Sequence, residues 1–175
     1  MAGIWIDPDV GAFRLGSGAF YNDAGVDVSD LFDPSSRISA GGSTLTLTSA
    51  SDSKTIMLDT LAGTVVTLPA ASGSGVRFKF VVSAAATSNS HIVKVANASD
   101  TFKGVILTLS DNSAAVLGYA AGASDDTITL NRGTTGSTIV GEWIEVEDIK
   151  ANVWAVRGIT ASTGTEATPF SATVS

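Results

Sequence analysis

The sequence contains no cysteine among its 175 residues. A chain without thiols forms no disulfide, offers no thiolate to a metal and has no cysteine nucleophile. The sequence also contains a single histidine, His91. One histidine does not by itself indicate a catalytic triad or a zinc site, because these need a nucleophile or further ligands placed around it. We therefore expect His91 to be structural or merely exposed.

Charge is scarce as well. Charged residues make up 15% of the chain and the mean hydropathy is +0.30, whereas a typical domain is about 25% charged. A protein with so little surface charge is expected to cover much of its surface with other protein, as in a homo-oligomer or a larger assembly. The alternative is a surface solvated by serine, threonine and glycine.

The charges that are present are mainly acidic. Ten lysines and arginines stand against 17 aspartates and glutamates, and no basic cluster occurs. Nucleic-acid binding through phosphate neutralisation is therefore not expected. The start, MAGIWIDPDV, lacks the basic region of a secretory signal, and the weakly polar run from Ala114 to Ala123 is too short to span a bilayer. No membrane partner is expected.

From Gly41 onward, short runs of Val, Ile, Thr and aromatic residues alternate with Gly, Ser, Asn, Asp and Pro. This residue pattern, with runs spaced close to 8–12 residues apart, predicts an all-β domain. The expected fold is an antiparallel β-sandwich of the jelly-roll kind or a small barrel. A short helix is conceivable only at Ala114–Ala123. The expected strands are Thr44–Thr48, Lys54–Leu58, Thr64–Leu68, Val76–Val82, His91–Ala96, Lys103–Leu109, Ala114–Tyr119, Thr127–Asn131, Glu142–Glu147 and Asn152–Arg157.

Period-2 alternation also predicts which side chains point inward. In Val76–Val82, the apolar side chains alternate with Arg77 and Lys79, so one face is apolar and the other charged. The predicted inward residues of the other strands are Leu45, Leu47, Ile56, Leu58, Val66, Leu68, Val93, Val95, Val105, Leu107, Leu109, Ile128, Leu130, Ile144, Val146, Trp154 and Val156.

Residues 1–39 differ from the rest. They are rich in glycine and aspartate, and they show neither a sustained strand alternation nor a helical stripe. We expect two parts, an extended N-terminal arm (1–39) and a single β domain (40–175). The arm is expected to dock on a neighbouring subunit or another protein, although a leader with one short strand remains open. Its aromatic anchors would be Trp5, Phe13, Phe20, Tyr21 and Phe32.

No constellation in the sequence predicts catalysis, a cofactor or a metal. Glu145 and Glu147 share a strand face about 7 Å apart, which could suit an acid/base pair, but a solvated edge face is favoured. The aspartates of the Ser/Asn-rich loops show no calcium-loop spacing, so turn chemistry explains them better. The Gly-rich run Pro69–Gly75 lacks the lysine and helix of a phosphate loop and is interpreted as a flexible turn.

Alternation places Trp143 on the face opposite the inward Ile144 and Val146. Partial exposure is therefore expected. Three interpretations remain open: packing in a second layer, a protein interface, or stacking against a sugar ring.

Between about residues 64 and 158 the chain carries TLPAASGSG, a following FKF, a later KGVIL and the hairpin WIEV…WAVRG. In these elements it resembles a module of virion structural proteins of tailed bacteriophages. The resemblance implies a non-enzymatic assembly subunit, made in the host cytoplasm and carried on the virion. Within that group the chain is most similar to a capsid decoration (cement) protein, which implies a homotrimer on the capsid surface bound to the major capsid protein.

The same module style occurs in tail and fibre proteins, which leaves a receptor-binding alternative. A tail-fibre or spike component would bind host glycans, with Trp143 or Tyr119 as the stacking residue. The short chain, without a fibrous repeat or a coiled coil, argues against a whole fibre.

Overall fold

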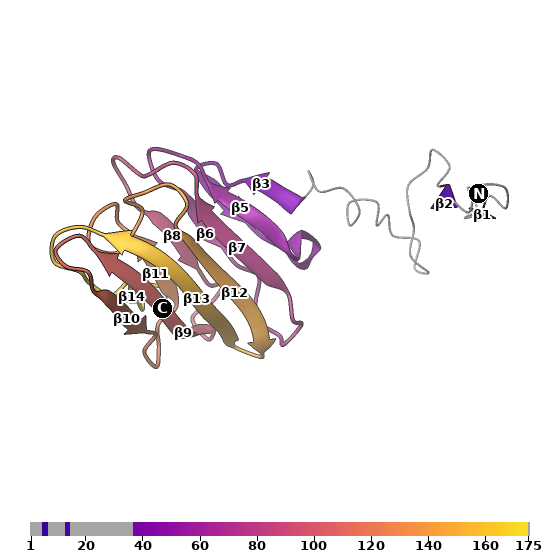
Figure 1. The fold of residues 1–175 in the computed structure, drawn as a ribbon. Helices are drawn as coiled ribbons and strands as arrows, with labels where there is room; N and C mark the ends of the chain where they lie inside the picture. The colour runs from indigo at the N-terminus through magenta and orange to yellow at the C-terminus, as the bar shows by residue number, and fades with distance from the viewer. Residues whose placement is uncertain (1–4, 7–12, 15–36, 175) are drawn as a thin grey trace. The chain divides into compact units, whose positions relative to one another are not determined.

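The computed structural model describes residues 5–6, 13–14 and 37–174 (Figure 1). The chain divides into two units, Met1–Arg37 and Ile38–Ser175. In the first unit, β1 (Trp5–Ile6) pairs antiparallel with β2 (Phe13–Arg14), so that Trp5 stands opposite Arg14 and Ile6 opposite Phe13.

The second unit is built from two β-sheets. The larger sheet has seven strands in the order β10-β9-β13-β12-β7-β5-β3, and the smaller sheet has five in the order β14-β11-β8-β6-β4. The elements are β3 (Ile38–Ala40), β4 (Thr44–Thr46), the 3₁₀ turn η3 (Ser49–Ser51), β5 (Lys54–Leu58), β6 (Val65–Thr67), β7 (Arg77–Val82), β8 (His91–Lys94), β9 (Thr101–Ser110), β10 (Val116–Ala120), β11 (Thr127–Leu130), β12 (Trp143–Lys150), β13 (Val153–Ser162) and β14 (Phe170–Ser171).

From β3 to β9 the chain changes sheet at every strand. As a result β3, β5 and β7 run parallel in the larger sheet, and β4, β6 and β8 run parallel in the smaller one. Parallel neighbours need a crossover, which is usually a helix. Here each crossover is a strand of the opposite sheet, so the first half of the unit winds around its own core.

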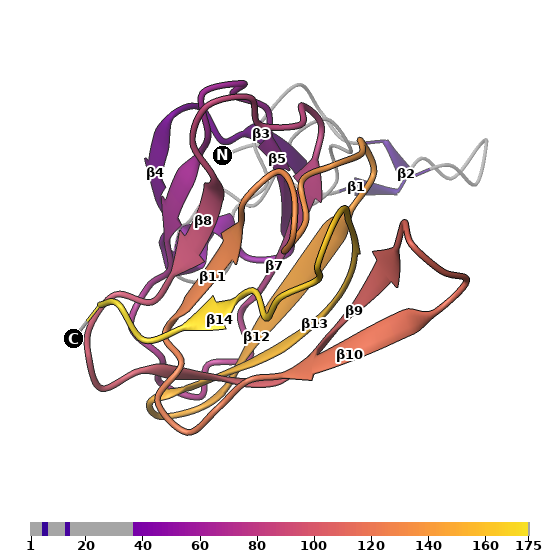
Figure 2. The same ribbon diagram turned by 90° about the vertical axis from the view of Figure 1, so that its left-hand side faces the viewer.

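From β9 onward the winding gives way to hairpins. Strand β9 pairs antiparallel with β10, and β12 pairs antiparallel with both β13 and β7. Strand β13 also runs parallel to β9 over ten residue pairs, and the β12–β7 pairing joins these strands to the wound part of the sheet. Figure 2 shows the β9–β10 hairpin at one edge of the larger sheet, with β8, β11 and β14 of the smaller sheet on the other side of the molecule.

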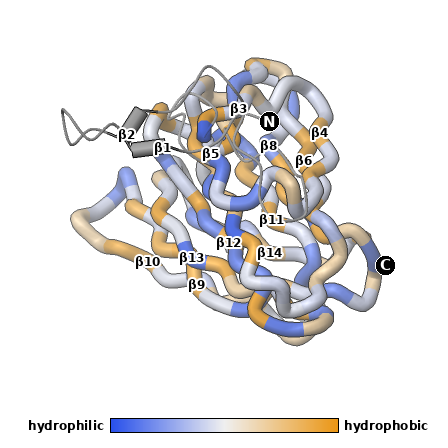
Figure 3. The backbone as a smooth tube through the Cα atoms, turned by 90° about the vertical axis from the view of Figure 1, so that its right-hand side faces the viewer, coloured by the Kyte–Doolittle hydropathy of each residue, from blue (hydrophilic) through white to orange (hydrophobic). Residues whose placement is uncertain are grey.

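The core lies between the sheets. Apolar and polar residues alternate along most strands, as the colours of Figure 3 show, because successive side chains of a strand point to opposite faces. The largest buried side chain is Trp154, whose ring lies 5.9 Å from that of Phe78 between ring centroids. Other fully buried residues come from both sheets, among them Ile56, Leu58, Leu68, Phe80, Phe102, Ile106, Ile128, Leu130 and Ile144.

The all-β sandwich predicted from the sequence is confirmed, and each of the ten expected strands is present within a few residues. One detail differs. The sheets are mixed rather than purely antiparallel, because the early strands wind between them. Residues 116–120 form strand β10, as the strand prediction has it, and not the alternative short helix, because they pair with β9 residue by residue.

Candidate interaction surface

The outer face of the larger sheet carries a row of apolar side chains that crosses its strands. In this row Met57 is paired with Val81, Val81 with Trp143, and Trp143 with Ile159. Ile159 is in turn paired with Leu107 on β9. With the neighbouring outward residues of β9 and β10, the row forms what we name the apolar stripe: Met57, Val81, Val105, Leu107, Leu109, Val116, Trp143 and Ile159.

The part of the stripe on β9, β10 and β13 is the most open. Val105, Leu107, Leu109, Val116 and Ile159 are each between 42% and 55% exposed. An isolated exposed apolar residue is ordinary, whereas a contiguous patch marks a site of interaction. The stripe is therefore the leading candidate for an interface among the described residues.

The sequence-based prediction that Val105, Leu107 and Leu109 point into the core is wrong. On β9 it is Phe102, Ile106 and Thr108 that are buried. Alternation establishes that three side chains share a face but does not say which face is inside. The inner face of β9 is less apolar than its outer face because Thr108 packs there, with its hydroxyl 2.7 Å from that of Thr160.

Gly104 explains how β9 approaches β13 so closely. It has φ +142°, and a Cβ built at this position would lie 1.9 Å from the carbonyl oxygen of Val156. Only glycine therefore fits here without shifting the parallel ladder between β9 and β13.

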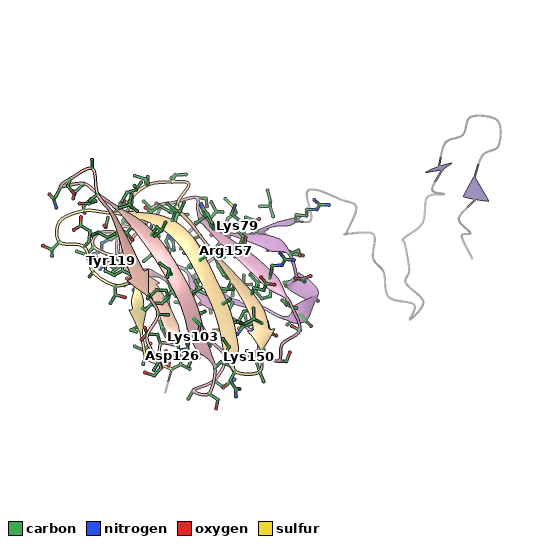
Figure 4. All side chains as sticks on the ribbon, turned by 60° about the horizontal axis from the view of Figure 1, so that its bottom comes forward. Lys79, Lys103, Tyr119, Asp126, Lys150 and Arg157 are labelled. Carbon is green, nitrogen blue, oxygen red and sulfur yellow. The ribbon has the colours of Figure 1, made fainter. Side chains whose placement is uncertain are left out.

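A charged band lies beside the apolar stripe on the same face. In one row Lys79 is paired with Glu145, and Glu145 with Arg157; in the next, Arg77 is paired with Glu147. The carboxylate of Glu145 accepts a hydrogen bond from the Arg157 guanidinium, and Glu147 lies 3.9 Å from Arg77. Lys79 and Arg157 are labelled in Figure 4.

The two glutamates do not form an isolated acid/base pair. Each carboxylate faces its own arginine, so the two do not face each other across a shared site. They were expected on a solvated edge face, but β12 lies between β7 and β13 in the interior of the larger sheet. Their role is consistent with holding the charged band together.

Trp143 is half-buried on this outer face, as its position opposite Ile144 predicts. The Lys79 ammonium lies 5.0 Å from the centroid of its ring, a cation–π distance. Stacking of a sugar on that side of the ring would require Lys79 to move. The contact favours packing and a protein interface over glycan binding.

A shallow hollow of ≈ 320 Å³ opens at the charged end of this face, between β5, β7 and β12. Three cations line it, Lys54, Arg77 and Lys79, together with Glu145. Among the described residues no carboxylate lies within ion-pair distance of Lys54 or Lys79. The hollow is therefore locally positive on a chain whose formal net charge is −7.

Buried carboxylates hold several loops of the β domain in place. Sequence reasoning did not predict this role for Asp148. The carboxylate of buried Asp148 accepts hydrogen bonds from the backbone N–H groups of Ser72, Gly73 and Ser74 and from both serine hydroxyls. The run Pro69–Gly75, expected to be a flexible turn, is thus wrapped around a carboxylate. Burial acts to raise the pKa of Asp148, but the hydrogen bonds from Ser72, Ser74 and Gly73 outweigh it and lower the pKa to about 2.

Glu142 repeats this arrangement. Its buried carboxylate accepts hydrogen bonds from the N–H groups of Ser137, Thr138 and Ile139, at 2.6–2.8 Å. Two further buried carboxylates accept backbone N–H groups, Asp100 from Ala71 and Asp126 from Thr173 and Val174. The sequence predicts that Asp100 and Asp126 cap their own turns, and this is wrong for the backbone donors: the N–H groups that they accept lie 29 and 47–48 residues away along the chain.

His91 is buried, in agreement with the structural role expected of it. Its Nδ1 accepts a hydrogen bond from the backbone N–H of Thr64, so the proton of the neutral ring is on Nε2, which donates to the carbonyl oxygen of Ala84 at 2.8 Å. The ring thereby ties β8 to two loops.

Replacing His91 with alanine should lower the free energy of unfolding by about 2–3 kcal/mol, because the buried N–H of Thr64 and the carbonyl of Ala84 lose their partner. Urea denaturation measures the change, with Asn89→Ala at an exposed position nearby as the control. Equal stability of the two variants would contradict this role.

The predicted arm anchors remain predictions. The backbones of Trp5 and Phe13 lie in β1 and β2, but the side chains of both, and Phe20, Tyr21 and Phe32 as a whole, lie outside the described residues.

Comparison with known proteins adds no further assignment: no family model, no curated protein and no solved structure matches the chain. Within residues 37–174 and the two short N-terminal strands, no helix has the length and hydropathy to cross a membrane. The same residues contain no group of three or more histidine, aspartate or glutamate side chains placed to hold a metal ion.

Proposed function

We propose that this chain is a non-enzymatic structural subunit of a tailed-bacteriophage particle, and within that class a head decoration protein. It would be made in the host cytoplasm, form a homotrimer and bind the major capsid protein on the outside of the head. The sequence similarity over residues 64–158 suggests the kind of particle. The apolar stripe is the observation that carries the proposal, because it supplies the protein-binding surface that such a subunit needs.

The mechanism would be stabilisation by mass action. A subunit that binds only the assembled shell shifts the equilibrium toward that shell by an amount that grows with its concentration relative to its dissociation constant. No chemical step is needed. The two-sheet core holds the strands of the outer face in register, so that little conformational entropy is lost when this face binds a partner.

The location can be tested by imaging native particles that carry a labelled copy of the protein. Copies distributed over the whole head are expected. A few copies at one vertex or along the tail would instead support the tail-fibre or spike alternative.

The stripe itself can be tested with Leu107→Asp. This position is 42% exposed, so the substitution should change the free energy of unfolding by only about 0.5 kcal/mol. A charge in the centre of an apolar contact should nevertheless weaken binding to heads by about tenfold or more, as measured by occupancy on purified heads.

The matched control is Val140→Asp, which places the same charge at an apolar residue that is 66% exposed in the loop before β12. Its binding should equal that of the parent chain. Full occupancy by Leu107→Asp, or an equal loss in both variants, would remove the stripe from the interface.

A further inference from the structure

The outer face of the larger sheet combines two features that a single ligand would have to match. One half presents the apolar stripe, and the other presents Lys79 at the hollow that Lys54 and Arg77 also line. The ligand should therefore be apolar along part of its length and acidic along another part. A face made only of apolar residues would give no such indication.

The chain contains a segment with this composition. Residues 1–36 include six aspartates and one arginine, a formal net charge of −5, while the remaining 139 residues carry the other −2. The same segment holds large apolar residues at intervals, including Trp5, Phe13, Phe20 and Phe32. It is thus complementary in charge to the hollow and similar in hydropathy to the stripe.

Length and attachment also fit. The segment leads into β3, the edge strand of the larger sheet, where Ile38 is 60% exposed. Thirty-six residues reach about 120 Å when extended, whereas seven strands span only about 30 Å across the sheet. The segment is long enough to cross the face of a neighbouring molecule.

We propose that the outer face of the larger sheet binds residues 1–36 of a second copy of this chain. The acidic residues of that segment meet Lys79 at the hollow, and its apolar residues cover the apolar stripe. This inference rests on the proposed function: the stripe joins one copy to the next in the oligomer that binds heads, so Leu107→Asp weakens head binding through the loss of that contact. Two copies of the face itself would oppose their Lys79 side chains.

The absence of cysteine permits a clean cross-linking test on the full chain. One variant carries Ser17→Cys in the segment, and a differently tagged one carries Ala161→Cys, which is paired with Leu109 beside the stripe. The two are mixed and oxidised. As a control, Thr46→Cys places the thiol at an exposed position of β4 in the smaller sheet.

A disulfide between the two tagged chains is expected, at a yield about tenfold or more above the Thr46→Cys control, because docking raises the local thiol concentration to roughly the millimolar range. Lys79→Glu in the Ala161→Cys partner should reduce this yield, and so should high salt. Lys94→Glu makes the same charge change on the smaller sheet and should leave the yield unchanged.

Three results would overturn the proposal. Equal yields at Ala161 and Thr46 would show that the face does not select the segment. Self-cross-linking of Ala161→Cys alone would assign the face to a second copy of itself. A disulfide that forms only inside a chain carrying both Ser17→Cys and Ala161→Cys would place the segment on its own sheet.

The outcome is separable from that of the proposed function. Decoration of heads by a protein that gives no exchange disulfide would reject the exchange and leave the function standing. An exchange disulfide in a protein that imaging does not find on the head would support the exchange and reject the proposed function.

Discussion

Replacing Asp148 with alanine should lower the free energy of unfolding by about 3 kcal/mol or more. The carboxylate accepts the N–H groups of three consecutive residues, Ser72, Gly73 and Ser74, at 2.7–3.1 Å. Each buried donor left without a partner costs about 1–3 kcal/mol. Because the loop is only part-buried and water can reach some of these groups, the lower end of the summed range applies.

Urea denaturation measures this effect, and Asp125→Ala is a suitable control. Asp125 is half-buried and accepts one backbone N–H, from Gly122, so its removal should change the stability by less than about 1 kcal/mol. Asp148→Asn keeps one acceptor oxygen and should fall between the two variants. If Asp148→Ala and Asp125→Ala were equally stable, the loop at 72–74 would not depend on the carboxylate.

The same site makes stability depend on pH in a defined range. The pKa of Asp148 falls from 3.8 to about 2 in the folded chain. A lowered pKa means that the contribution is fully present above pH 4 and is lost as the pH falls toward 2, because protonation removes the charged acceptor. The shift corresponds to roughly 2 kcal/mol, and the Asp148→Asn variant should lack this part of the acid sensitivity.

Local pattern was enough to predict the strands. The alternation in Arg77–Val82, with Phe78 and Phe80 buried between exposed Arg77 and Lys79, is a signal carried by six neighbouring residues. Such a signal does not depend on the rest of the chain. The β-sandwich class followed from the number and spacing of these runs.

The parallel pairing of the early strands and the loops held by buried carboxylates could not be predicted from local pattern, because both depend on residues far apart in sequence. Asp148 lies 76 residues from Ser72, and its neighbours in sequence give it the look of an ordinary hairpin residue. The residue pattern within a strand is the same whether the strand pairs with the following strand in a hairpin or runs parallel to the one after that. The outward position of Leu107 has a related cause, since it is tied to contacts of β9 with β13, in which Gly104 lies against Val156 and Thr108 against Thr160, about 50 residues away in sequence.

The second large effect is expected in the core. Trp154→Ala should lower the free energy of unfolding by about 3–5 kcal/mol, the usual range for emptying a fully buried aromatic site. Phe78, whose ring is 5.9 Å away between centroids, would border the cavity. Trp154→Phe should be much milder, because it keeps an aromatic ring and removes an indole N–H that has no hydrogen-bond partner among the described residues. Equal losses in both variants would contradict a packing role.

Trp154 and Leu107 together separate scaffold from interface. Trp154 lies on the inner face of β13 and Leu107 on the outer face of the adjacent β9. Trp154→Phe should therefore lower the denaturation midpoint while folded protein binds heads as before, and Leu107→Asp should do the opposite. If Trp154→Phe reduced binding without unfolding the chain, the shape of the outer face would depend on the core beneath it, and the apolar stripe would no longer be the sole determinant of binding.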